Sequence, residues 1–176
     1  MNKSFNVKTL TMGGAIAALY VVLTWVSKLL DLDSQAIQLR LSEALTILPV
    51  FTFAAVPGLT LGCLLANITV GCMPGDVVLG TLATLLGAIG TRLLRKHVEI
   101  AWLPPVISNM LIVPFVLIYV YMIPDVSFTI PFTKTTLAAS GYVPIMITVG
   151  IGEVLACGWL GLLLHKALKK TPGLND

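Results

Sequence analysis

The chain has 176 residues, of which 57% are hydrophobic and 11% are charged, and its mean hydropathy is +0.96. Soluble domains carry about 25% charged residues, so this composition excludes an ordinary soluble protein and indicates an integral membrane protein. The formal net charge of +3 is informative only through where each charge lies. The length predicts one transmembrane domain, residues 1–176.

Four segments are long and apolar enough to cross a bilayer, which takes about 20 residues of helix. Residues 10–30, 76–94 and 143–164 fit directly. Residues 100–123 also fit, although Pro104, Pro105 and Pro114 are expected to bend that helix. Residues 44–72 are too long for one span. The turn signal Pro57-Gly58 near their middle predicts a hairpin of two short helices there.

Basic residues decide the number of spans. Lysines flank both ends of the chain, and cytoplasmic ends with an even number of spans satisfy the positive-inside rule. With six spans, eight basic residues fall inside and three outside. The inner ones are Lys3, Lys8, Arg92, Arg95, Lys96, Lys166, Lys169 and Lys170, and the outer ones are Lys28, Arg40 and Lys134. We therefore expect an all-α bundle of six transmembrane helices with both termini in the cytoplasm. The outer surface would include a polar loop after Pro124 that could cover an opening.

Residues 37–49 (IQLRLSEALTILP) place Gln38, Arg40 and Glu43 at the mouth of an apolar segment. Ionised groups beside a bilayer are costly unless they pair or meet a ligand. Arg40 and Glu43 are three residues apart, so on a helix they share a face. One interpretation is a salt bridge that caps the second span. The other is the polar floor of a binding site for a small molecule.

Further polar residues lie inside the predicted spans. Glu153 is near the middle of the last span, where a carboxylate must face the protein interior or a wet cavity. It could bind a ligand or an ion, or it could lock two helices together. Asn67 and Asn109 could read the edge of a heterocycle or join two helices. Asp76, in the first turn of its helix, is interpreted as a cap.

Two carboxylates and two amides suit a ligand with a cationic amine and a guanine-like donor edge. The residues do not identify that ligand by themselves. Cys63, Cys72 and Cys157 have no metal or redox spacing and are interpreted as packing residues. The sequence has no G-x-x-x-x-G-K-[ST] motif, so it cannot bind ATP through a P-loop. With no nucleophile–base set and no metal motif, we expect neither an enzyme nor a resident metal or cofactor.

The first segment contains two overlapping pairs of small residues, Gly13 with Ala17 and Gly14 with Ala18. Small residues four apart let another helix approach closely. These pairs could serve internal packing, or they could dock a separate membrane subunit.

Residues 37–49 resemble the signature of the queuosine precursor transporters, the QueT family. The resemblance continues through residues 57–67 and 79–85 and ends at Gly152-Glu153, and it covers nearly all of the chain except the loop after Pro124. It implies a six-helix substrate-binding S component of an energy-coupling factor (ECF) transporter in a bacterial cell membrane. Such a protein captures a 7-deazaguanine such as 7-aminomethyl-7-deazaguanine from outside. Its partners are a transmembrane coupling subunit and two cytoplasmic ATPases.

The resemblance also gives the polar residues expected roles. Glu43 and Glu153 would divide the ligand's amine and its N1/N2 donor edge. Asn67 or Asn109 would reach the carbonyl oxygen, and Arg40 would orient Glu43 or contact the base. The Gly14-xxx-Ala18 spacing is similar to the motif by which S components dock the coupling subunit. Two other functions stay open: an S component for another vitamin or nucleobase, and a stand-alone permease with Glu153 as its proton carrier.

Overall fold

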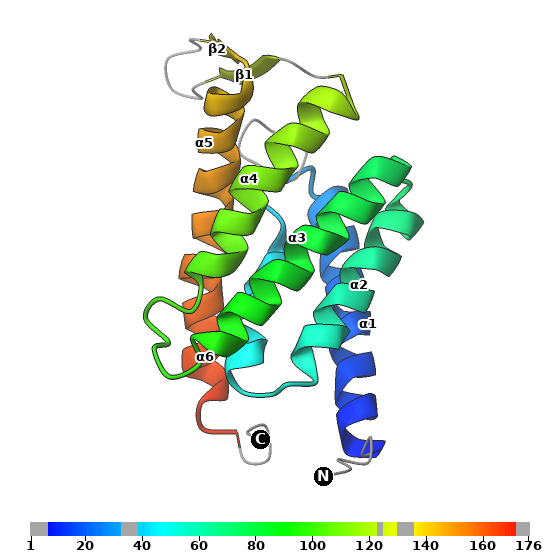
Figure 1. Cartoon of the computed structure of the whole chain (residues 1–176), viewed down its shortest axis with the longest axis vertical. Coiled ribbons are helices and arrows are strands. Elements are labelled where there is room, and N and C mark those ends of the chain that lie inside the picture. The colour runs from blue at the N-terminus through cyan, green and yellow to red at the C-terminus, as the bar shows by residue number, and fades with distance from the viewer. Residues whose placement is uncertain (1–6, 33–38, 123–124, 130–135, 172–176) are drawn as a thin grey trace.

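The structure is a computed structural model that describes residues 7–32, 39–122, 125–129 and 136–171 (Figure 1). Its helices in chain order are α1 (Val7–Leu29), η1 (Leu41–Val50), α2 (Ala55–Val70), α3 (Pro74–Leu93), α4 (Leu103–Tyr119), α5 (Tyr142–Glu153), η2 (Val154–Leu160) and α6 (Gly161–Leu168). The segment η1 is a 3-10 helix and η2 is a π-helix. Because α5, η2 and α6 follow one another without a break, they form a single helical rod of 27 residues.

Three helices of the described chain are long and apolar enough to cross a membrane: α1, α3 and the α5–η2–α6 rod. Each matches a span predicted from the sequence to within a few residues at either end. The other apolar helices are shorter, at 10, 16 and 17 residues for η1, α2 and α4. The helical membrane-protein class is confirmed, whereas six complete spans and cytoplasmic termini stay predictions.

The hairpin of two short helices is present, but its turn is not where the sequence placed it. The chain turns at residues 51–54, between η1 and α2. Pro57 and Gly58 lie in the first turn of α2. Proline is tolerated there because the first N–H groups of a helix have no intrahelical partner. Similarly, Pro104 and Pro105 lie in the first turn of α4, which begins at Leu103.

The loop after Pro124 contains a β-hairpin that the all-α prediction missed. Strands β1 (Asp125–Thr129) and β2 (Thr136–Ser140) pair antiparallel, with Asp125 opposite Ser140. The strands lie at the end of the bundle opposite the start of α1 and the end of α6, which lie together at the other end (Figure 1). This placement agrees with an even number of crossings between those two points.

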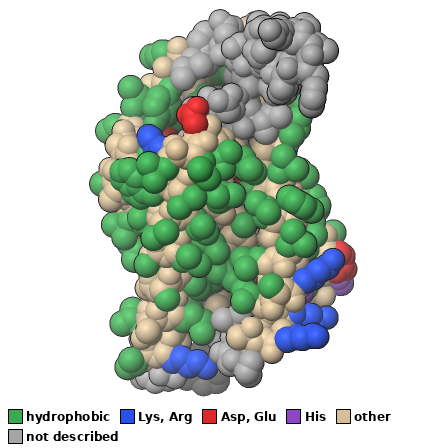
Figure 2. All heavy atoms as spheres, turned by 180° about the vertical axis from the view of Figure 1, so that it is seen from behind, with side chains coloured by type: hydrophobic (Ala, Val, Ile, Leu, Met, Phe, Trp, Pro, Cys, Tyr) green, Lys and Arg blue, Asp and Glu red, His purple; other side chains and the backbone are tan. Residues whose placement is uncertain are grey.

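The outer surface of the bundle is apolar. Large hydrophobic side chains are exposed on every long helix, among them Val22, Leu82 and Ile151. Figure 2 shows apolar side chains over the middle of the visible face and charged side chains towards its two ends. This arrangement is the one expected for a protein surrounded by lipid tails.

The segment η1 occupies the centre of the bundle and packs against α1, α3, α6 and η2. Seven of its ten residues are buried. On one side it joins an apolar core with α1 and α2, which includes Ile16, Leu48 and Leu59. Its N-terminal residues, which include Glu43, face a polar interior.

Candidate functional site

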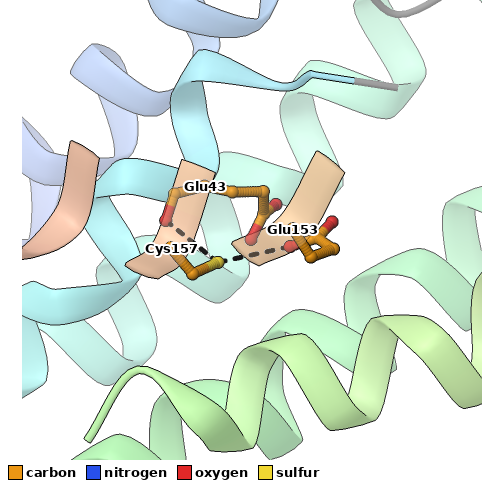
Figure 3. A group of neighbouring side chains, drawn as sticks. All are labelled: Glu43, Glu153 and Cys157. Carbon is orange, nitrogen blue, oxygen red and sulfur yellow. Dashed lines mark hydrogen bonds between the residues drawn. The ribbon is translucent and has the colours of Figure 1, made fainter. Parts of the chain in front are cut away.

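Two acidic side chains from distant parts of the chain meet in the interior. Glu43 comes from η1 and is 2% exposed, and Glu153 ends α5 and is 6% exposed. One carboxylate oxygen from each acid and the sulfur of Cys157 lie within 4.8 Å of one another (Figure 3). The sequence predicted both acids as site residues, and the structure brings them together.

Local helix geometry turns these side chains toward one another. Glu43 and Thr46 are three residues apart, a spacing that stacks side chains on one side of a 3-10 helix. Glu153 and Cys157 are four apart at the junction with the π-helix, and the Cys157 Sγ lies 3.2 Å from Glu153 Oε2. The same sulfur lies 3.6 Å from the carbonyl oxygen of Glu43, so it joins the two segments (Figure 3). Single-turn π segments within α-helices are frequent at functional sites.

The two oxygens of Glu43 have different surroundings. The hydroxyl of Tyr20, on α1, donates a hydrogen bond to Oε1. Oε2 is buried and has no hydrogen-bond partner. A buried polar atom without a partner costs about 1–3 kcal/mol, and more when it is charged. Glu43 therefore offers an unused acceptor that faces the interior.

Asn109 of α4 completes this side of the site. It is 5% exposed and interacts electrostatically with both Glu43 and Glu153. An amide carries two donors and one acceptor, so Asn109 can support a carboxylate and still contact a ligand.

Arg40 and Asp76 also belong to the polar interior. Arg40 precedes η1, is half-buried, and interacts electrostatically with both Asp76 and Glu43. Asp76, in the first turn of α3, is 6% exposed. Its Oδ2 accepts a hydrogen bond of 2.9 Å from Tyr121, whose oxygen accepts one from the Met73 backbone N–H at 3.2 Å.

Asn67 lies beside Asp76. It is 3% exposed, and its described hydrogen bonds go to two sulfur atoms, those of Cys63 at 3.5 Å and Cys72 at 4.0 Å. Sulfur is a weak donor and a weak acceptor, so these contacts satisfy the amide poorly. A Cβ placed on Gly80 would lie 3.1 Å from Asn67 Nδ2 and 3.2 Å from Asp76 Oδ1. Glycine at this position lets both side chains approach the backbone of α3 closely.

Five of the six residues predicted to bind the substrate lie in the polar interior. They are Arg40, Glu43, Asn67, Asn109 and Glu153. Gln38 lies outside the described residues. The described buried charged residues are all acidic: Glu43, Asp76 and Glu153.

Sequence reasoning missed three residues of this interior. Asp76 had been interpreted as a cap and Cys157 as a packing residue, and Tyr20 had not been singled out. A signal for Tyr20 was available. Tyr20, Thr24 and Ser27 follow i, i+4, i+7 spacing in an apolar helix, and all three are buried.

The two pairs of small residues on α1 face different ways. A Cβ on Gly58 of α2 would lie 2.7 Å from the carbonyl oxygen of Gly13, and one on Gly62 would lie 3.0 Å from Ala17 Cα. Gly13 and Ala17 therefore pack against α2. Gly14 and Ala18 are exposed, and a Cβ on Gly14 would meet nothing within 4 Å.

Glu43, Glu153 and Cys157 are close enough to hold a metal ion in principle. The same oxygens suit the ammonium group of an organic ligand, because charge-assisted N–H···O bonds are strong and short. The geometry of these three side chains is compatible with a metal ion and with an ammonium group.

A family model described as the QueT transporter matches residues 10–170. The match includes every interior residue named above. Searches of curated proteins and of solved structures returned no match. The matched family consists of transporters and not of enzymes, and its membrane setting agrees with the apolar helices. With nearly the whole chain matched, this protein belongs to the QueT transporter family.

Proposed function

We propose that this chain is the substrate-binding S component of an ECF transporter in a bacterial cell membrane. It captures a queuosine precursor, a 7-deazaguanine such as 7-aminomethyl-7-deazaguanine, from outside. The observation that carries the proposal is the buried Oε2 of Glu43, which lacks a partner beside the second carboxylate, Glu153. A protonated amine supplies the donors that this oxygen lacks.

The charge of the interior supports a cationic ligand. The three buried acids face a single half-buried cation, Arg40, among the residues described around them. Unbalanced buried charge is costly, and a ligand with one positive charge reduces the imbalance. The flat base of a deazaguanine also offers N–H donors and a carbonyl acceptor to Asn67, Asn109 and Arg40.

Binding to the purified chain in lipid nanodiscs tests the substrate. We expect radiolabelled 7-aminomethyl-7-deazaguanine to bind wild-type protein and Glu153→Gln to weaken it by about a hundredfold, because removing one partner of a buried charged contact costs about 2–5 kcal/mol. Undiminished affinity would remove Glu153 from the site. Preferential binding of thiamin or riboflavin would instead indicate an S component for another ligand.

Uptake measurements test the energy source. We expect transport only when a coupling subunit and two ATPases are co-expressed and ATP is supplied. Uptake by the chain alone, driven by a proton gradient and abolished by Glu153→Gln, would indicate a stand-alone permease.

The exposed pair Gly14 and Ala18 is the proposed docking surface for the coupling subunit. Small residues on a lipid-facing stripe permit close helix approach. Ala18→Trp should abolish co-purification of the coupling subunit while ligand binding to the isolated chain persists. Leu19→Trp is the control, since Leu19 is 46% exposed on a different side of the same helix. Equal loss of the partner in both variants would argue against this surface.

A further inference from the structure

The closeness of Glu43 and Glu153 bears on which ligand group each contacts. One carboxylate oxygen of Glu43 lies within 4.8 Å of one oxygen of Glu153, so a single ammonium group placed between these two oxygens would contact both. In 7-aminomethyl-7-deazaguanine the amine and the 2-amino group lie at opposite ends of the fused rings. Two carboxylates this close are poorly placed to divide those ends. The geometry favours a joint contact of Glu43 and Glu153 with the cation, and it leaves the N1/N2 edge without an acceptor.

Asp76 is the third buried acid of the described interior. Its Oδ2 is held by Tyr121 at 2.9 Å, which fixes the carboxylate, while Oδ1 is on the side of Gly80 and Asn67. A helix cap explains neither the tyrosine nor the close approach of Asn67 to Asp76 at Gly80. A fixed carboxylate can accept the N1–H and 2-amino hydrogens of a guanine-like edge side by side.

The half-buried cation of the described interior interacts with acids of both groups. Arg40 has favourable electrostatic interactions with Glu43 and with Asp76. Its guanidinium supplies hydrogen-bond donors only. A 7-aminomethyl-7-deazaguanine carries an ammonium group, a carbonyl oxygen and an N–H edge, so its two donor regions suit the acids and its carbonyl oxygen suits Arg40.

We propose that Asp76 is a substrate-binding residue that accepts the N1/N2 edge of the base, while Glu43 and Glu153 together hold the ligand's cation. This inference rests on the proposed function, because it takes a 7-deazaguanine as the ligand. Arg40, which interacts with both Glu43 and Asp76, donates to the carbonyl oxygen.

Titration calorimetry with three ligands tests the assignment. The ligands are 7-aminomethyl-7-deazaguanine, its analogue without the 2-amino group, and 7-deazaguanine without the aminomethyl group. Wild-type protein should bind the first about tenfold or more tightly than the second, as expected for hydrogen bonds to a charged acceptor. In Asp76→Asn that preference should nearly vanish, whereas the preference for the aminomethyl group should persist.

Tyr121→Phe is the matched control. It removes the hydrogen bond to Asp76 but leaves the carboxylate, so the preference for the 2-amino group should remain. If Asp76 serves only to hold α3, both variants should lose affinity for all three ligands equally, and the assignment would be wrong. Retention of the wild-type preference in Asp76→Asn would also overturn it.

Gly80→Ala provides a second route if Asp76→Asn does not fold. The added methyl group would lie 3.2 Å from Asp76 Oδ1 and 3.1 Å from Asn67 Nδ2. These atoms must then shift, so binding of the parent ligand should weaken more than binding of the analogue without the 2-amino group. Equal weakening would contradict the assignment. If wild-type protein binds none of the three ligands, the proposed function itself fails.

Discussion

Two tyrosine–carboxylate pairs lie in the polar interior, and their differences explain how one site could recognise two kinds of ligand group. Tyr20 donates to one oxygen of Glu43, and Tyr121 donates to one oxygen of Asp76. In each pair the phenol fixes the carboxylate. The first pair lies beside another carboxylate, Glu153, whereas Arg40 interacts electrostatically with both pairs. Two adjacent acids call for a cation, whereas a single acid with a guanidinium nearby can accept the N–H groups of a neutral ligand edge.

The pairs also differ in exposure. Tyr20 is 2% exposed and lies in the packed contact between α1 and α2, while Tyr121 is half-buried beyond the end of α4. Interactions in a dry interior are less screened than those near the surface. Substitutions at the Tyr20–Glu43 pair should therefore have larger effects.

Glu43→Gln should have the largest effect. It removes the charge at the unpartnered oxygen, so affinity for 7-aminomethyl-7-deazaguanine should fall about a hundredfold. Glu99→Gln is the matched control, because Glu99 has a side chain that is 74% exposed on the connection before α4. If calorimetry gave Glu43→Gln and Glu99→Gln the same affinity for the ligand, the buried acid would have no special role in binding.

Gly62→Val should displace Tyr20 and so disturb the Tyr20–Glu43 pair. A Cβ at Gly62 would lie 2.8 Å from Tyr20 Cβ, so α1 must shift away from α2. Overpacking of this kind costs about 1–3 kcal/mol, and we expect a lower thermal midpoint and weaker ligand binding. Gly14→Val is the control, because the space around Gly14 is open. A thermal midpoint lowered equally by both would show that α1 packs differently.

Tyr20→Phe should weaken ligand binding more than Tyr121→Phe does. Loss of the Tyr20 hydroxyl removes the donor to Oε1 of Glu43, whose Oε2 already lacks a partner, and we expect about a tenfold loss of affinity. The Tyr121 hydroxyl can be replaced by water at its half-exposed position, so its loss should be about threefold. The reverse order in calorimetry would contradict the ranking of the two pairs.

Cys157→Ala should have the smallest effect on the first pair. The thiol is a weak hydrogen-bond partner, so affinity should change by less than about threefold. Addition of a chelator should leave ligand binding unchanged, because the proposed cation belongs to the ligand. A large loss of binding in either experiment would favour a metal ion held by Glu43, Glu153 and Cys157.

The sequence predicted the long helices well and the short ones less well. Hydrophobic length alone locates α1, α3 and the α5–η2–α6 rod. The turn after η1 was misplaced because Pro57-Gly58 is a strong turn signal that is also compatible with the first turn of a helix. No sequence pattern in residues 41–50 predicts a 3-10 helix. The conformation of this segment depends on its packing at the centre of the bundle.

Two of the three buried acids were predicted as site residues from the sequence. Glu43 and Glu153 stand out because ionised groups in apolar segments are costly. Asp76 was not recognised as part of the interior because an acid in the first helical turn is ordinarily explained by the helix dipole. Its contact with Tyr121 joins residues 45 positions apart, which only the fold reveals.

The most direct test of the central claim compares two ligands on wild-type protein. The 7-aminomethyl and 7-cyano forms of 7-deazaguanine share the base but differ in charge. If Glu43 and Glu153 hold a cation, the aminomethyl form should bind at least about a hundredfold more tightly in titration calorimetry. Equal affinity for the neutral cyano form would contradict the account.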